Sequence, residues 1–65
     1  MTGWAFTIQP PGDEISHTVC VAIESNFDAQ AKALLRTAGV VISDRPLSDA
    51  VLRSLRMKPN DVKVI

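Results

Sequence analysis

The sequence contains very few of the residues that crosslink small proteins. Cys20 is the only cysteine and His17 the only histidine among 65 residues. A single cysteine cannot close an intramolecular disulfide, and this pair cannot build a structural zinc cage. The fold must therefore rest on packing, and one unpaired cysteine favours a reducing compartment such as the cytoplasm.

Long apolar runs, export signals and excess charge are also lacking. No run approaches the ~20 apolar residues that span a bilayer, and the N-terminus has neither the basic nor the apolar region of a signal peptide. Seven Lys and Arg residues balance seven Asp and Glu residues, which excludes a uniformly basic nucleic-acid binder. With 46% hydrophobic residues, the chain predicts one small globular domain over residues 1–65, cytoplasmic and without membrane contact.

Two segments on either side of a proline-rich loop, residues 10–16, alternate between large apolar residues and smaller ones. The large residues are Trp4, Phe6, Ile8, Val19, Val21 and Ile23. A period of two is typical of β-strands, and an antiparallel hairpin in the matching register places all six residues on one face. The sequence therefore predicts an N-terminal hairpin with one strongly apolar face.

The apolar period changes to that of a helix after Ser25, which we predict to be the N-cap, and Gly39 is predicted to follow the helix end. The expected buried stripe of this helix is Phe27, Ala31, Leu34, Leu35 and Ala38. A second helix is predicted from the N-cap Ser48 to about Lys58, because Pro59 disfavours the helical conformation of the residue before it. Its expected buried residues are Val51, Leu52 and Leu55.

Two short β-branched segments complete the predicted sheet. Residues 40–42 are expected to form a short buried strand, and residues 61–65 a terminal strand. The topology beyond the hairpin is left open; if residues 40–42 join the sheet beside the second strand of the hairpin, the crossover through the helix should be parallel and right-handed. The predicted class is α+β, in the order β-β-α-β-α-β. Both helices are expected on the large-residue face of the small sheet.

The opposite face of the predicted hairpin carries small residues. It would present Ala5 and Thr7 beside Thr18, Cys20 and Ala22. Such a face is either covered by another part of the chain or open as an interface for a second copy or another protein.

Potential catalytic residues occur together only in the hairpin loop. Asp13, Glu14, Ser16 and His17 include an acid, a nucleophile and a base, but a seven-residue loop is a poor scaffold for fixing their geometry. His17 and Cys20 lie an odd number of residues apart on one strand, so they point to opposite faces and cannot share a metal ion. We therefore expect no enzymatic activity, no metal and no cofactor.

Basic residues gather in the second half of the chain, where they are candidates for contacting phosphates or an acidic protein. They are Arg45, Arg53, Arg56 and Lys58. A helix-turn-helix motif joins its helices by three or four residues, whereas the connection over residues 39–47 is longer and contains a β-branched run. No set of aromatic residues is free to stack on bases. A nucleic-acid-binding module is therefore the alternative function rather than the leading one.

The predicted hairpin followed by an alanine-rich helix, over residues 4–38, resembles several small phage or mobile-element proteins that bind and block a host protein, including anti-CRISPR proteins. The resemblance implies a non-catalytic protein-binding module, or a small inhibitor or regulator of a partner protein. It implies no particular functional residue. A chain of this length also has little core, so we expect that it gains buried surface from a partner or from a second copy in a homodimer.

The zero net charge is the sum of two unlike halves. Residues 1–31 carry four acidic residues and no Lys or Arg, whereas residues 32–65 carry all seven basic residues and three acidic ones, a net charge of +4. If the fold separates these halves, the molecule has an acidic and a basic end, each able to contact a partner. The partner-binding candidates are therefore Asp13 and Glu14 together with Arg45, Arg53, Arg56 and Lys58.

Overall fold

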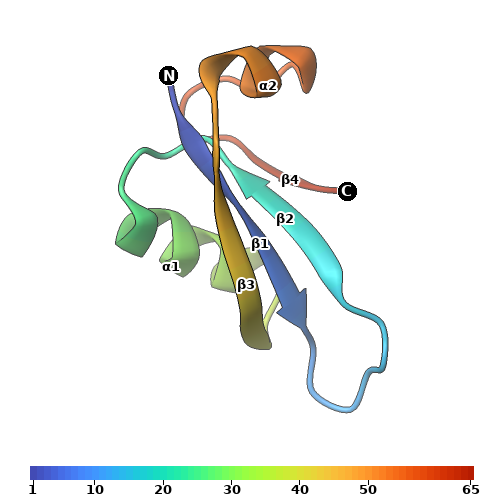
Figure 1. Cartoon of the computed structure of the whole chain (residues 1–65). Helices are drawn as coiled ribbons and strands as arrows, with labels where there is room; N and C mark the ends of the chain where they lie inside the picture. Colours follow the sequence, from blue (N-terminus) through green and yellow to red (C-terminus); the bar gives the residue numbers. More distant parts are fainter.

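The computed structural model, which describes all 65 residues, contains a four-stranded sheet and two helices (Figure 1). The elements are β1 (Gly3–Gln9), β2 (His17–Val21), α1 (Asn26–Arg36), β3 (Val40–Leu47), α2 (Asp49–Ser54) and β4 (Val62–Val64). The strand order is β3-β1-β2-β4, and every pairing is antiparallel. The predicted α+β class and the order β-β-α-β-α-β are confirmed.

The central pair β1 and β2 forms the hairpin that the alternation predicts. Trp4 lies opposite Val21 and Phe6 opposite Val19, so the large apolar residues share one face. Four of these side chains are completely buried: Phe6, Ile8, Val19 and Val21. The half-buried indole of Trp4 donates a hydrogen bond from Nε1 to the Glu24 carbonyl at 2.9 Å, which fixes the chain where it leaves β2.

Helix α1 covers this large-residue face, but it does so through alanines. Ala29 and Ala33 are fully buried against the sheet, whereas Phe27 is 82% and Leu35 87% exposed. The prediction that the larger apolar residues of this helix are buried is therefore wrong. Because the sheet already presents bulky side chains, small helix residues allow close approach, and the larger ones are turned to the opposite side of the helix. Ser25 caps the helix as predicted, since its Oγ accepts a hydrogen bond from the Asp28 amide.

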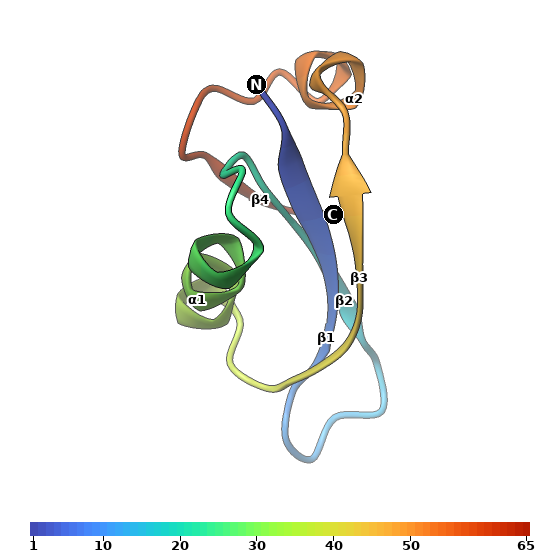
Figure 2. The ribbon, with the colours of Figure 1, turned by 60° about the vertical axis from the view of Figure 1, so that its left-hand side comes forward.

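Helix α2 packs against the other face of the sheet, and in Figure 2 it lies beyond the end of β3, away from α1. The cluster there consists of Ala5, Cys20, Ala22, Leu47, Leu52 and Met57. The expectation that both helices share one face is thus wrong, because small strand residues on this face leave room for larger ones from the α2 region. The chain itself covers the Cys20 side of the hairpin.

The end of each helix comes earlier than predicted. Helix α2 stops at Ser54, and Arg56 then adopts a left-handed conformation with φ 58°. Helix α1 ends at Arg36 with Thr37 as its C-cap, so Gly39 does not follow the helix end directly. Gly39 is needed for a different reason. Its φ is +155°, and a Cβ at this position would lie 2.4 Å from the Gln9 carbonyl oxygen.

Strand β3 differs most from its prediction. It continues beyond the predicted residues 40–42 as far as Leu47, and it pairs antiparallel with β1, so the parallel crossover to β2 does not form. It lies at one edge of the sheet and is largely exposed. Its pairing with β1 is interrupted by a register shift at Thr7 and Ile8. The remaining strand, β4, forms the other edge beside β2.

The orientation of α1 can be tested by making the same change, alanine to leucine, once on the buried side of the helix and once on the exposed side. Ala33→Leu inserts a larger side chain into the packed interface and is expected to lower the free energy of unfolding by about 1–3 kcal/mol. Ala31→Leu lies on the exposed side and should change it by less than about 0.5 kcal/mol. Urea unfolding of dilute protein, followed by Trp4 fluorescence, measures both values. Equal losses would contradict the orientation described above.

Candidate protein-binding surface

Five of the six charged residues predicted to bind partners lie at opposite ends of the molecule. Asp13 and Glu14 are in the loop between β1 and β2, and Arg53, Arg56 and Lys58 are in α2 and the segment after it (Figure 1). The molecule measures 34 × 21 × 16 Å, so it is elongated. The structure therefore does not gather these residues into one site; it separates an acidic end from a basic end.

At the acidic end, Asp13 organises its own loop. Its Oδ1 accepts a hydrogen bond from the Ile15 amide, and its backbone carbonyl accepts one from Gln9 Nε2, both at 3.0 Å. The other carboxylate oxygen lies 4.0 Å from Nε2 of His17. Asp13 thus has the role of a turn-forming residue. Glu14 is exposed and has no ion pair.

At the basic end, part of the positive charge is balanced locally. Asp49 lies 2.6 Å from Arg53 and 3.3 Å from the N-terminal amine of Met1. Asp49 and Arg53 stand at the i, i+4 spacing that favours an ion pair on a helix. Arg56 and Lys58 have no ion pair. The charges free to attract an anionic partner here are therefore fewer than the sequence indicates.

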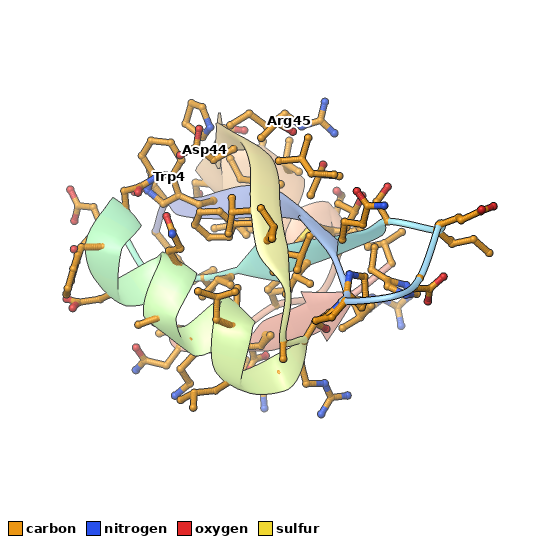
Figure 3. The ribbon with its side chains drawn as sticks, turned by 90° about the horizontal axis from the view of Figure 1, so that it is seen from below. Trp4, Asp44 and Arg45 are labelled. Atoms are coloured by element: carbon orange, nitrogen blue, oxygen red, sulfur yellow. The ribbon has the colours of Figure 1, made fainter.

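Arg45 stands apart from both ends, on the exposed part of the sheet. Figure 3 shows Asp44 and Arg45 on opposite sides of β3, with Asp44 on the side of Trp4. The strand register places Arg45, Ala5, Cys20 and Lys63 in one row across the sheet. Burial raises the pKa of the Cys20 thiol, and the charges of Arg45 and Lys63 at the two ends of this row partly oppose that rise.

The raised pKa of Cys20 makes stability depend on pH in a defined direction. The folded protein favours the neutral thiol, whereas the unfolded chain releases its proton above the ordinary pKa of 9.0. Stability from this group is therefore complete below pH 9 and is lost as the pH rises further. Urea unfolding from pH 7 to pH 10 should show the wild type losing stability relative to Cys20→Ala above pH 9. A constant difference over the whole range would contradict burial of the thiol.

The outward side of α1 carries the two most exposed large apolar side chains of the structure, Phe27 and Leu35. Phe27, Ala31 and Leu35 are exposed along it, and Leu34 is half-buried between this side and the core. Four apolar side chains, three large and one small, thus form a stripe along one side of this eleven-residue helix. We call these four residues the outer stripe of α1.

A shallow groove of about 250 Å³ runs along the outer stripe. Its lining residues are Asn26, Phe27, Gln30, Ala31 and Leu34. The position of this groove is fixed, because the Ser25 cap holds the start of the helix and Asn26 Nδ2 donates a hydrogen bond to Asp44 Oδ2 of β3 at 3.0 Å. The groove is thus part of a helix that is capped at its start and linked there to β3.

Sequence reasoning identified the stripe residues but assigned them to the core. A helical projection groups Phe27 with Ala31, Leu34 and Leu35, yet it does not say whether this side or the alanine side faces the sheet. The useful signal was the size of the hairpin residues. A sheet face filled by Phe6, Ile8, Val19 and Val21 leaves little space for large helix side chains.

A second open groove lies beside Trp4, at the junction of β1 with the end of β3. Thr2, Gly3, Glu24, Pro46, Leu47 and Ser48 line the rest of it. Two of its polar groups are used within the chain, since Trp4 Nε1 donates to the Glu24 carbonyl and Ser48 Oγ accepts from the Val51 amide.

Comparison of the chain with protein-family models, with curated proteins and with solved structures finds no match. No group of three or more His, Cys, Asp or Glu residues is arranged to hold a metal ion. Neither helix has the length and apolar character required to cross a membrane. The assignment of a binding surface therefore rests on the geometry of α1.

Proposed function

We propose that this protein is a non-catalytic protein-binding module that contacts its partner through the outer stripe of α1. The observation that carries the proposal is the inverted packing of this helix. Its alanines face the core, while Phe27 and Leu35 point away from the sheet. Large exposed apolar residues grouped on one rigid element are characteristic of interaction surfaces.

The energetics of the stripe favour association. Full burial of a Phe or Leu side chain contributes roughly 1.5–3 kcal/mol relative to leaving it exposed. Phe27 and Leu35 keep more than four-fifths of their surface exposed, so nearly all of this contribution is still open to a partner. Because α1 is already folded and capped, binding orders only a few side chains and loses little conformational entropy. Phe27 is the expected anchor of the contact.

A module of this kind can act as a small inhibitor or regulator by occupying a surface that its partner needs. The hairpin and helix, residues 4–38, form one unit in which α1 is fixed on β1 and β2. This arrangement suits the blocking role of the phage and mobile-element proteins that the sequence resembles. In this proposal the chain contributes a surface and no reacting group.

Nucleic-acid binding by the basic end is the alternative, and the contacts favour it less. Arg53 is paired with Asp49, which leaves Arg56 and Lys58 as the unpaired cations of that end. The exposed aromatic residue is Phe27, which lies on α1 and not beside these cations. Proteins that bind single-stranded nucleic acid place cations beside its phosphate backbone and aromatic side chains beside its bases, in the same groove.

Photo-crosslinking tests the proposed surface directly. A photoreactive benzoylphenylalanine incorporated at Phe27 should form covalent adducts with protein in an extract of the source cells, because the partner covers this side chain. The matched control carries the same residue at Ile15, which is 68% exposed in the hairpin loop, far from α1. Gel electrophoresis and mass spectrometry identify the adducts. Adducts from both positions alike, or from neither, would contradict the proposal.

The alternative makes a separate prediction about salt. If the basic end binds nucleic acid, fluorescence anisotropy with labelled DNA or RNA will show binding at low salt that weakens steeply as salt is added. Arg53→Glu combined with Arg56→Glu should then remove the binding, whereas Phe27→Ser should leave it unchanged. We expect no detectable binding at low salt, and salt-sensitive binding by the wild type would overturn this expectation.

A further inference from the structure

We infer that the groove beside Trp4 is a second binding site of this protein, and that it takes an arginine side chain presented by a partner protein. The site is separate from the outer stripe of α1, so the inference goes beyond the proposed function and is tested without it. Three features of the groove carry it: a fixed aromatic surface, a free carboxylate beside that surface, and the lack of basic side chains.

The aromatic surface of the groove is held in one orientation. Part of the Trp4 ring packs against the core cluster under α1, and the rest lines the groove, which has a volume of about 490 Å³. The strand register places Pro46 opposite Trp4 on the same face of the sheet, so its ring lines the groove next to the indole. The hydrogen bond from Trp4 Nε1 to the Glu24 carbonyl, at 2.9 Å, fixes the ring. A planar cation can therefore lie on a preformed aromatic surface.

The same hydrogen bond places an acidic residue at the edge of the indole. Glu24, whose carbonyl accepts the bond, lines the groove and is exposed, and its carboxylate has neither an ion pair nor a hydrogen bond. Asp44 adds a second carboxylate. It lies on the Trp4 side of β3 (Figure 3), and its hydrogen-bond partner is the neutral Asn26 side chain. The negative charge beside Trp4 is therefore uncompensated.

No basic side chain lines this groove. None of its seven lining residues is Lys, Arg or His. Arg45 follows Asp44 in the sequence but lies on the opposite side of β3 (Figure 3), and Asp49 pairs with the nearby N-terminal amine of Met1. The groove therefore attracts a cationic ligand and repels an anionic one.

The hydrogen-bonding groups of the groove favour a ligand that donates. The indole N–H is engaged with the Glu24 carbonyl, and Pro46 has no amide. The Glu24 carboxylate, by contrast, is an acceptor without a donor. A guanidinium group supplies five N–H donors and no acceptor, its plane stacks on aromatic rings, and its fork matches a carboxylate. Arginine therefore fits the groove better than lysine, whose ammonium is compact and strongly hydrated.

The source of the arginine is a protein rather than the free amino acid. Free arginine carries a carboxylate, for which the groove has no cation, whereas an arginine within a chain carries none. The groove also lies close to the start of α1, because Asn26, which lines the groove of the outer stripe, binds Asp44 on the Trp4 side of β3. A partner protein seated on α1 can thus reach Trp4 with one side chain.

The experiment is an NMR titration of the isotope-labelled full chain with capped peptides. Acetyl-Gly-Arg-Gly-amide should bind saturably, with a Kd on the order of 1 mM because one side chain makes few contacts. It should shift the Trp4 Nε1–H resonance. The arginine Hδ protons should move upfield through the ring current of Trp4, the only tryptophan of the chain. The citrulline peptide has the same shape without the charge and should not bind detectably, and the lysine peptide should bind more weakly.

Two glutamine variants test the position of the contact. Glu24→Gln removes the charge beside Trp4 but keeps the backbone carbonyl that accepts the indole N–H, so it should raise the Kd about two- to fivefold. Glu14→Gln is the matched control, because it removes the same charge from the distant hairpin loop and should leave the Kd unchanged. Equal effects of the two variants, or equal binding of the arginine and citrulline peptides, overturn the inference.

Other occupants of the groove give distinct results. Tighter binding of free arginine would identify the amino acid as the ligand, and a Trp4 Nε1–H resonance that shifts with protein concentration alone would identify a second copy. Either result overturns the inference, as does a Trp4 resonance that stays unshifted when the arginine peptide is in excess. None of these results changes the expected Phe27 adducts, so the proposed function stands or falls separately.

Discussion

The rest of the structure depends on a matching of side-chain sizes across the two faces of the β1 and β2 pair. One face carries large residues such as Phe6 and Val21, and it is covered by alanines of α1. The other carries Ala5, Cys20 and Ala22, and it is covered by larger residues from the end of β3 and the α2 region. Each layer can approach closely only if large side chains meet small ones, because protein interiors are close-packed. With 13 of 65 residues buried, little core remains once this matching is lost.

The matching has a direct consequence for binding. Since α1 needs only small residues on its inner side, its large apolar residues take no part in the core and point away from the sheet. One side of α1 therefore serves folding and the opposite side is available for binding. A substitution at Ala33 affects the packing on the sheet, whereas a substitution at Ala31 affects only the exposed side. The outer stripe is rigid because the sheet, the Ser25 cap and the Asn26 contact to Asp44 hold the helix in place. A preformed surface of this kind binds without first having to be ordered.

The remaining surface restricts where a partner can attach. The acidic loop is organised by Asp13, and the basic end is partly neutralised by the contact of Asp49 with Arg53. Pro46 and the neighbouring charges disfavour addition of a strand to β3. The separation of charge along the molecule persists, however, and it favours partners or copies that align opposite signs. Electrostatics thus contribute orientation, whereas the outer stripe of α1 contributes the area that association requires.

The sequence by itself determined the hairpin, the start of both helices and the order of the elements. Alternation of large and small residues, and the capping serines Ser25 and Ser48, are local signals that act within a few residues. Only the tertiary structure decided which side of α1 faces the sheet, which face receives α2, and that β3 pairs with β1. These choices depend on the volume left between elements far apart in the chain, and α1 is apolar on two sides, so its own periodicity could not select one. The candidate surface went unrecognised for this reason: its residues have the composition of a core, and only the space beside Phe6 and Val21 shows that they cannot be part of it.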